Sequence, residues 1–236
     1  MPYNLNMDFK KKKLIRKTHR YLGLIMAIQF LMWTISGLYF SWTNIDEIHG
    51  DHFKTGHVHS SAAGKLPNIC NLSTIGNIRS LLWKEIGDEP YYWVNDSILI
   101  HAISGEQKTE ITIEEAISIA DAHLVEDMEV REVAYLTQTD GHHEYREKPL
   151  PAYAITYEHP SSPTAYVSVK DGRFQAIRHQ SWRWFDLLWM THTMDYESRD
   201  NINNWLLRLF SLFGLITVFS GLTLWVVSTR LFMKRG

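Results

Sequence analysis

Four histidines crowd a short segment that directly follows a long apolar run. The segment IDEIHGDHFKTGHVH covers residues 45–59 and contains His49, His52, His57 and His59. Imidazole and carboxylate groups together suit iron and other first-row metal ions. His57 and His59 lie further along the segment and are interpreted as solvated. The sequence predicts a metal-binding surface made of the earlier residues, which are His49, His52, Asp46, Glu47 and Asp51.

Another histidine lies in an apolar helical pattern near the C-terminal end. His192 belongs to residues 182–196, where apolar residues recur at steps of three and four, as in an amphipathic helix with His192 on its apolar face. Such a histidine can be the axial ligand of a haem held against an apolar wall. Alternatively, it is a core residue of a helix lying on a membrane surface, and the residues alone favour this second interpretation.

Two apolar segments are long enough to position these groups at a membrane. We place one membrane helix at residues 22–43 and another at residues 205–228, because about 20 apolar residues span the hydrocarbon layer. The first segment is longer than the apolar core of a secretory signal, and no A-x-A cleavage site follows it. We therefore expect it to be an uncleaved anchor in contact with membrane lipid.

The charges that flank the two segments predict their orientation. Residues 1–21 carry a dense run of Lys and Arg, and residues 229–236 add three more cations. Cations near membrane ends stay on the cytoplasmic side. We expect both termini in the cytoplasm and the region between the helices outside it. In a bacterium this places the chain in the inner membrane with its main domain in the periplasm.

Composition excludes several function classes. The single cysteine, Cys70, cannot form an intrachain disulfide or a cysteine metal cluster. The net charge of −2 gives no sign of nucleic-acid binding. The chain has no GxGxxG signature for a nucleotide or flavin. An electron donor, if one is used, stays open between a quinol and a separate cytoplasmic reductase.

The intervening region, residues 44–181, reads as an α+β domain. A helix is expected over residues 112–124, where Thr112 and Glu115 have the spacing of a capping box. A weaker helix is expected over residues 73–83. Residues 182–204 are interpreted as the membrane-proximal helix and a connector. Further patterns predict a linker at 59–67, a hairpin over 91–103, and strands at 129–137, 152–158, 164–169 and, after an Asp-Gly turn, 173–177.

Three stretches together resemble the PepSY-associated transmembrane family. They are HRYLGLIMAIQFLMWTISGLYFSW (19–42), the 112–120 helix followed by the KDGR hairpin (170–173), and SGLTLWVVSTR (220–230). The resemblance covers most of the chain. It implies a membrane protein in which two transmembrane α-helices flank an α+β extracytoplasmic, PepSY-like domain. Family members include haem-containing ferric reductases of bacterial inner membranes.

The resemblance implies a cofactor and an activity. The cofactor is haem b, for which His192 is the first choice of ligand, then His19, then His49. His19 and His49 are 30 residues apart, about 45 Å along an unbroken helix, so they cannot hold the same iron. The implied activity is reduction of Fe³⁺ to Fe²⁺ at the periplasmic face, in support of iron uptake. His49 keeps two further roles, as a ligand of the substrate iron or as a solvated residue.

The number of helices bears on assembly. Larger relatives have four or more spans, whereas two helices alone cannot enclose a haem. We therefore expect a homodimer that forms a four-helix bundle. Ser36-Gly37-Leu38 in the first segment and Ser220-Gly221-Leu222 in the second let helices, or a flat porphyrin, approach closely, and plain helix packing is the simpler account.

Two functions of other classes stay open. The outer domain can be a binding or inhibitory module for a peptide or protease, with the two helices as anchors and no cofactor. The chain can also be an accessory subunit of a larger redox or transport complex, without haem of its own. His142 and His143 are interpreted as solvated, and no role is given to the remaining histidines, His101, His123, His159 and His179.

Overall fold

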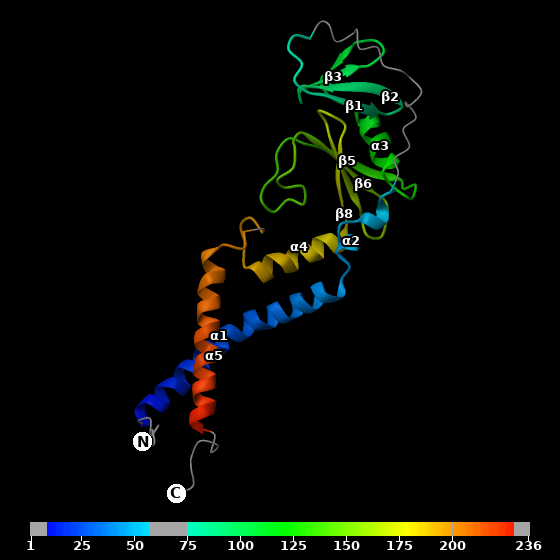
Figure 1. Cartoon of the computed structure of the whole chain (residues 1–236). Helices are drawn as coiled ribbons and strands as arrows, with labels where there is room; N and C mark the ends of the chain where they lie inside the picture. The colour runs from blue at the N-terminus through cyan, green and yellow to red at the C-terminus, as the bar shows by residue number, and fades with distance from the viewer. Residues whose placement is uncertain (1–8, 57–74, 200, 229–236) are drawn as a thin grey trace. The chain divides into compact units, whose positions relative to one another are not determined.

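The computed structural model describes residues 9–56, 75–199 and 201–228. The chain divides into two units. The helical unit consists of the residues up to 42 and those from 186 onwards, and the middle unit consists of residues 43–185. Figure 1 shows the long helices formed by the two ends of the chain and the strands formed by the part of the sequence between those helices. The predicted class is confirmed, because two apolar helices flank a region of two antiparallel sheets and a helix. His57, His59 and the predicted linker lie outside the described residues.

Two helices, α1 (Phe9–Trp42) and α5 (Trp205–Ser228), are long and apolar enough to cross a membrane. α5 has the bounds expected from the sequence, whereas α1 begins well before its apolar segment and includes the basic residues. Only 17% and 6% of their most apolar windows are buried. Large apolar surfaces of this kind suit lipid and would be costly in water. Where the helices meet, Met26 of α1 packs over Gly214 of α5, and a Cβ on this glycine would make an ordinary contact of 3.5 Å with Met26 Cε.

The amphipathic stretch before α5 folds as helix α4 (Gln180–Thr193). Its last carbonyl groups, at residues 191–193, find side-chain donors in the helical unit. They accept hydrogen bonds from Gln29 Nε2 at 3.1 Å, Trp33 Nε1 at 2.8 Å and Asn204 Nδ2 at 3.0 Å. The end of a helix leaves such carbonyls without partners inside the helix. These contacts therefore hold the last turn of α4 in place.

The connector between α4 and α5 is tied together by two polar side chains. The buried carboxylate of Asp195 accepts hydrogen bonds from the backbone N–H groups of Ser198, at 3.2 Å, and Asn201, at 2.8 Å. Asn204 accepts one from the N–H of Leu207 at 2.8 Å, which is the geometry of a helix N-cap. Asn204 thus caps α5 while its amide group holds the end of α4.

The middle unit contains two antiparallel sheets, each with its strands in sequential order. Two short helical turns precede them, α2 (Ile45–Ile48) and the 3₁₀ helix η1 (Asp51–Phe53). The first sheet consists of β1 (Leu81–Ile86), β2 (Glu89–Val94), β3 (Ile98–His101) and β4 (Gln107–Lys108). The second sheet consists of β5 (Val130–Leu136), β6 (Ala152–Tyr157), β7 (Thr164–Ser168) and β8 (Phe174–Arg178).

Both predicted hairpins are present. The β2–β3 turn has Asn95 and Asp96 at positive φ, 51° and 54°, as a two-residue I′ turn requires. The β7–β8 turn has Gly172 at φ 65° in the predicted Asp-Gly pair. The predicted helix over residues 73–83 is wrong, because its end forms β1 and pairs with β2. The Asn95 side chain accepts a hydrogen bond from the Arg79 backbone N–H at 2.7 Å. This contact holds the segment before β1 in a non-helical conformation.

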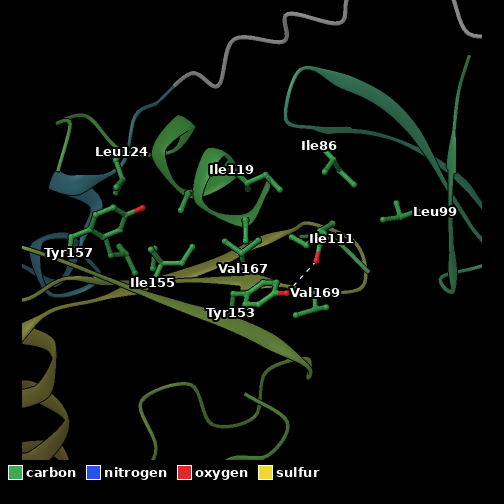
Figure 2. Packing of buried hydrophobic residues seen from close by; sticks show 14 of the residues in the cluster. Ile86, Leu99, Ile111, Ile119, Leu124, Tyr153, Ile155, Tyr157, Val167 and Val169 are labelled. Carbon is green, nitrogen blue, oxygen red and sulfur yellow. Dashed lines mark hydrogen bonds between the residues drawn. The ribbon is translucent and has the colours of Figure 1, made fainter. Parts of the chain in front are cut away.

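The long helix of the middle unit, α3 (Ile113–Ala122), covers the second sheet. Its predicted capping box is confirmed, since Thr112 and Glu115 each accept the other's backbone N–H. Figure 2 shows Ile119 of α3 lying over Ile155 and Val167 of the sheet. This core joins α3 and both sheets, and it gives the unit a rigid frame for the residues around it.

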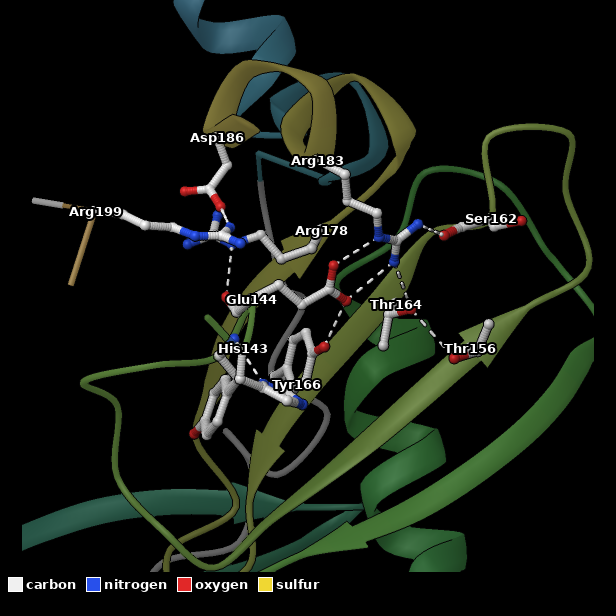
Figure 3. A network of polar contacts seen from close by, with 11 residues as sticks. His143, Glu144, Thr156, Ser162, Thr164, Tyr166, Arg178, Arg183, Asp186 and Arg199 are labelled. Carbon is white, nitrogen blue, oxygen red and sulfur yellow. Dashed lines mark hydrogen bonds and ion pairs between the residues drawn. The ribbon is translucent and has the colours of Figure 1, made fainter. Parts of the chain in front are cut away.

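A polar network fixes the start of α4 to the second sheet (Figure 3). Arg183 in the first turn of α4 donates two hydrogen bonds to the Glu144 carboxylate, at 2.6 and 3.0 Å. Tyr166 of β7 donates a third to the same carboxylate at 2.6 Å. Burial alone would raise the pKa of Glu144, but the hydrogen bonds from Arg183 and Tyr166 outweigh it and hold this pKa below its usual range. Glu144 is therefore a charged anchor for α4.

Candidate functional site

His192 lies in the last turn of α4, against α1. Its Nδ1 is 2.7 Å from Ser36 Oγ, and its backbone carbonyl accepts the hydrogen bond from Trp33. Nε2 has no hydrogen-bond partner among the described residues. The ring lies among aromatic side chains, with centroids 5.6 Å from Phe40 and 6.5 Å from Trp189, the latter stacked. The half-buried imidazole is thus held at one nitrogen and enclosed by apolar rings, with its other nitrogen open.

The surface of α1 beside His192 leaves room for a flat group. Trp33, Ser36, Gly37 and Phe40 share one face of α1, since they are three, four and seven residues apart. A Cβ added to Gly37 would meet nothing within 4 Å. The surface of α1 is therefore open at Gly37, the residue that follows Ser36.

His19 has a similar environment where α1 contacts α5. Its Nδ1 lies 2.9 Å from Ser220 Oγ and 3.2 Å from the carbonyl oxygen of Thr217, both in α5. A Cβ on Gly221 would lie 3.0 Å from His19 Cε1, so the ring rests on the backbone of this glycine. Nε2 has no hydrogen-bond partner in the part of the chain that the structure describes.

The two histidines lie at different levels along α1, since His19 belongs to this helix and His192 of α4 contacts its residue Ser36. Ser36, which contacts His192, follows His19 by 17 residues, which is about 25 Å along a helix. The two imidazoles of one chain therefore cannot coordinate the same metal ion. That His19 and the outer histidines serve opposite membrane faces stays a prediction.

The five residues of the predicted metal surface lie around α2 and η1 and are all exposed. Asp51 is engaged by Lys54 at 2.6 Å, and this contact, more than its neighbouring histidines, holds the pKa of Asp51 low. Within residues 9–56, 75–199 and 201–228, no three His, Cys, Asp or Glu side chains form a group that could hold a metal ion. The metal surface of His49, His52, Asp46, Glu47 and Asp51 therefore stays a prediction.

Two of these residues line a cavity of about 250 Å³ together with histidines for which the sequence analysis predicts no role. Glu47 and His52 meet His159 and His179 there. The buried His179 donates a hydrogen bond from Nε2 to the Glu47 carbonyl at 2.9 Å, and its ring centroid is 5.1 Å from that of His52. The sequence separation of 132 residues between Glu47 and His179 left no local signal for this contact.

The buried His179 in this cavity should make the stability of the middle unit depend on pH. Burial lowers the pKa of His179 below its usual range, against the hydrogen bond to the Glu47 carbonyl, and the nearby His52 and Arg183 lower it further. The unfolded chain therefore binds more protons below about pH 6.5, so this stabilisation is complete above that pH and is lost as the pH falls toward the folded-state pKa. One proton contributes a slope of at most about 1.4 kcal/mol per pH unit.

Amide hydrogen exchange of the second sheet, measured on the full chain in detergent between pH 7.5 and pH 5, checks this. The opening free energy should fall with pH after correction for intrinsic exchange. His179→Gln, which keeps an N–H for the Glu47 carbonyl, should reduce the slope. An unchanged slope in this variant would assign the dependence to other groups.

Sequence reasoning missed the serines that contact the two histidines. Ser36 and Ser220 open the two Ser-Gly-Leu tripeptides, which were interpreted only as close-packing positions. The structure shows a second use, because each serine meets a histidine from another helix. The repeat of this tripeptide in both apolar helices was the available signal.

Comparison with known proteins gives one match. The model of the PepSY-associated TM region matches residues 6–228, which is nearly the whole chain. The chain belongs to this family, and the resemblance seen in the sequence is confirmed at that level. No curated protein and no solved structure matches the chain.

Proposed function

We propose that this member of the PepSY-associated transmembrane family is a haem b protein that carries electrons across a membrane and reduces Fe³⁺ to Fe²⁺ at its outer face. The observation that carries the proposal is the pair of histidines, His192 and His19, each held at Nδ1 and open at Nε2. Haem iron is commonly bound through one imidazole nitrogen in an apolar pocket.

The residues around His192 fit a haem. The imidazole supplies the donor atom, and the rings of Phe40 and Trp189 supply an apolar wall. A Cβ on Gly37, which follows Ser36 in α1, would meet nothing within 4 Å, so a flat macrocycle could approach α1 at this position. When bound, the haem would supply one-electron redox chemistry, while the protein would orient the imidazole and exclude water from it.

The other predicted residues take supporting roles in this proposal. His19 would hold a second redox site at a different level of α1 or contribute to one in a partner chain. His49 is exposed at the end of α2, and we assign it with Glu47 and His52 to the capture of the substrate Fe³⁺ rather than to the haem. Imidazole and carboxylate ligands suit this ion.

The assembly and orientation follow from the sequence. Two helices per chain leave the outer sides of both histidine sites open, and a homodimer would close them in a four-helix bundle. The cations at both ends favour cytoplasmic termini, which would place the middle unit in the periplasm of a bacterium. The electrons would then come from the cytoplasmic side, from a quinol or a separate reductase.

Absorption spectroscopy of the detergent-purified chain tests the proposal. We expect a Soret band as isolated and sharper α and β bands after dithionite. The reduced chain, mixed with Fe³⁺ and a chromophoric Fe²⁺ chelator under argon, should generate the coloured complex as its α band decays.

A visible spectrum that stays featureless after haem supplementation would overturn the proposal and leave a peptide-binding module or accessory subunit. If the haem is present but Fe²⁺ does not form, the reductase activity is lost and an electron carrier remains. The chain prepared without haem is the control for adventitious reduction by thiol or detergent.

A further inference from the structure

The hydroxyl beside His192 lies close to two backbone groups that can only accept a hydrogen bond. Ser36 Oγ lies 2.7 Å from the carbonyl oxygen of Met32, 3.2 Å from that of Trp33 and 2.7 Å from His192 Nδ1. A carbonyl oxygen only accepts, and a serine hydroxyl has one hydrogen to donate. When the buried Ser36 donates to the Met32 carbonyl of its own helix, its oxygen offers a lone pair to the imidazole. In this arrangement His192 Nδ1 carries the proton of the contact.

The same reasoning applies to the second pair. Ser220 Oγ donates to the carbonyl oxygen of Thr217 at 2.8 Å and faces His19 Nδ1 at 2.9 Å. The Thr217 carbonyl also lies 3.2 Å from this Nδ1, and it too can only accept. Two acceptors thus converge on His19 Nδ1, which must be the protonated nitrogen.

We propose that Ser36 and Ser220 are positioning residues that hold His192 and His19 as Nδ1–H tautomers and so keep each Nε2 lone pair open for a metal. A neutral imidazole with a proton on Nδ1 has its lone pair on Nε2. The use of that lone pair rests on the proposed haem function, whereas the position of the proton does not.

Three histidines of the middle unit have the opposite arrangement, whereas His123, whose Nδ1 lies 2.7 Å from the carbonyl oxygen of Ile119, has the proton on Nδ1. His101 and His159 each accept a backbone N–H at Nδ1, from Ser104 at 3.0 Å and Ser161 at 3.2 Å. In their neutral forms the proton is therefore on Nε2. His179 donates from Nε2 to a carbonyl. The position of the proton thus depends on the groups around each ring, and at His192 and His19 the serine of a Ser-Gly-Leu tripeptide is one of those groups.

Nitrogen-15 NMR of histidine-labelled protein, prepared without haem in detergent at pH 8, tests the proton positions directly. His192 and His19 are assigned by the signals lost in His192→Gln and His19→Gln. Both should show the Nδ1–H pattern, whereas His101 and His159 should show the Nε2–H pattern in the same sample. A dominant Nε2–H pattern for His192 and His19 would overturn the inference, whether or not the chain binds haem.

Serine variants test the cause. Ser36→Ala should move His192 toward the Nε2–H form and leave His19 unchanged, while Ser220→Ala should do the reverse. Ser36→Thr, which keeps a hydroxyl, should retain the pattern. Each variant is thus the matched control for the other, and an unchanged tautomer in both alanine variants would show that the serines do not set it.

Haem titration of the same variants separates this inference from the proposed function. Loss of a partner behind a metal-bound histidine typically weakens metal affinity about 10–100-fold, and we expect this for Ser36→Ala with rescue in Ser36→Thr. If the tautomers are as predicted but the unchanged chain binds no haem, the proposed function fails and the positioning role stands. Equal haem affinity in Ser36→Ala and the unchanged chain would overturn the link to metal binding.

Discussion

Replacing His192 with alanine should weaken haem binding by more than about a hundredfold. Changes to groups that only support a ligand already cost about 10–100-fold, so loss of the ligand should exceed that range. The fold should survive, because Trp33 donates to the backbone carbonyl of residue 192, which alanine keeps. Haem titration followed at the Soret band, with the reduced α band as a second readout, measures the effect.

The matched control is His49→Ala. His49 is exposed at the end of α2 and, among the residues that the structure describes, makes no aromatic or side-chain hydrogen-bonded contact like that of His192, so its loss should leave haem affinity unchanged. Free imidazole added to His192→Ala should restore part of the α band by filling the space left by the ring. Full haem affinity in His192→Ala, or its loss in His49→Ala, would contradict the ligand assignment.

The second large effect concerns the turn between α2 and η1. Gly50 has φ +74°, and a Cβ there would lie 2.7 Å from Cγ2 of Ile177, a fully buried side chain in β8. Left-handed backbone costs a residue with a Cβ about 1–2 kcal/mol, and overpacking adds about 1–3 kcal/mol. Gly50→Ala should therefore destabilise the middle unit by about 2–5 kcal/mol, measured by amide exchange in β6 and β7 of the full chain.

Two other glycines separate the contributions. Gly87 also has a positive φ, of 59°, but an added Cβ meets nothing within 4 Å, so Gly87→Ala should show the backbone cost alone, about 1–2 kcal/mol. Gly56 has free space and no positive φ, so Gly56→Ala should have little effect. Equal effects at Gly50 and Gly87 would show that Ile177 moves aside at no cost.

Local sequence signals predicted the elements whose stabilising contacts lie within one continuous segment. The apolar length of α5 and the capping box of α3 each lie within one continuous segment, as does the Asp-Gly turn of the β7–β8 hairpin. β1 was misassigned because its strand state depends on pairing with β2 and on the Asn95 side chain, 16 residues away from Arg79. Pairing across the chain overrode a weak helical pattern.

The candidate site divides in the same way. The sequence predicted that His192 lies on the apolar face of a helix, because the apolar residues around it recur at steps of three and four. Its contact with Ser36 spans 156 residues, and the contact of His19 with Ser220 spans 201. No periodicity within one segment reports such pairs. His179 was missed for the same reason, since its partner, Glu47, lies 132 residues away.

The anchored end of α4 has a consequence for the speed of the proposed electron transfer. Gln29, Trp33 and Asn204 fix the carbonyl groups around His192, and Ser36 fixes its ring. A ligand held this firmly changes position little when the charge on a bound iron changes, because its dipoles are already oriented. The reorganisation energy of the redox couple should therefore be small, so that electrons can pass rapidly even when the driving force is slight.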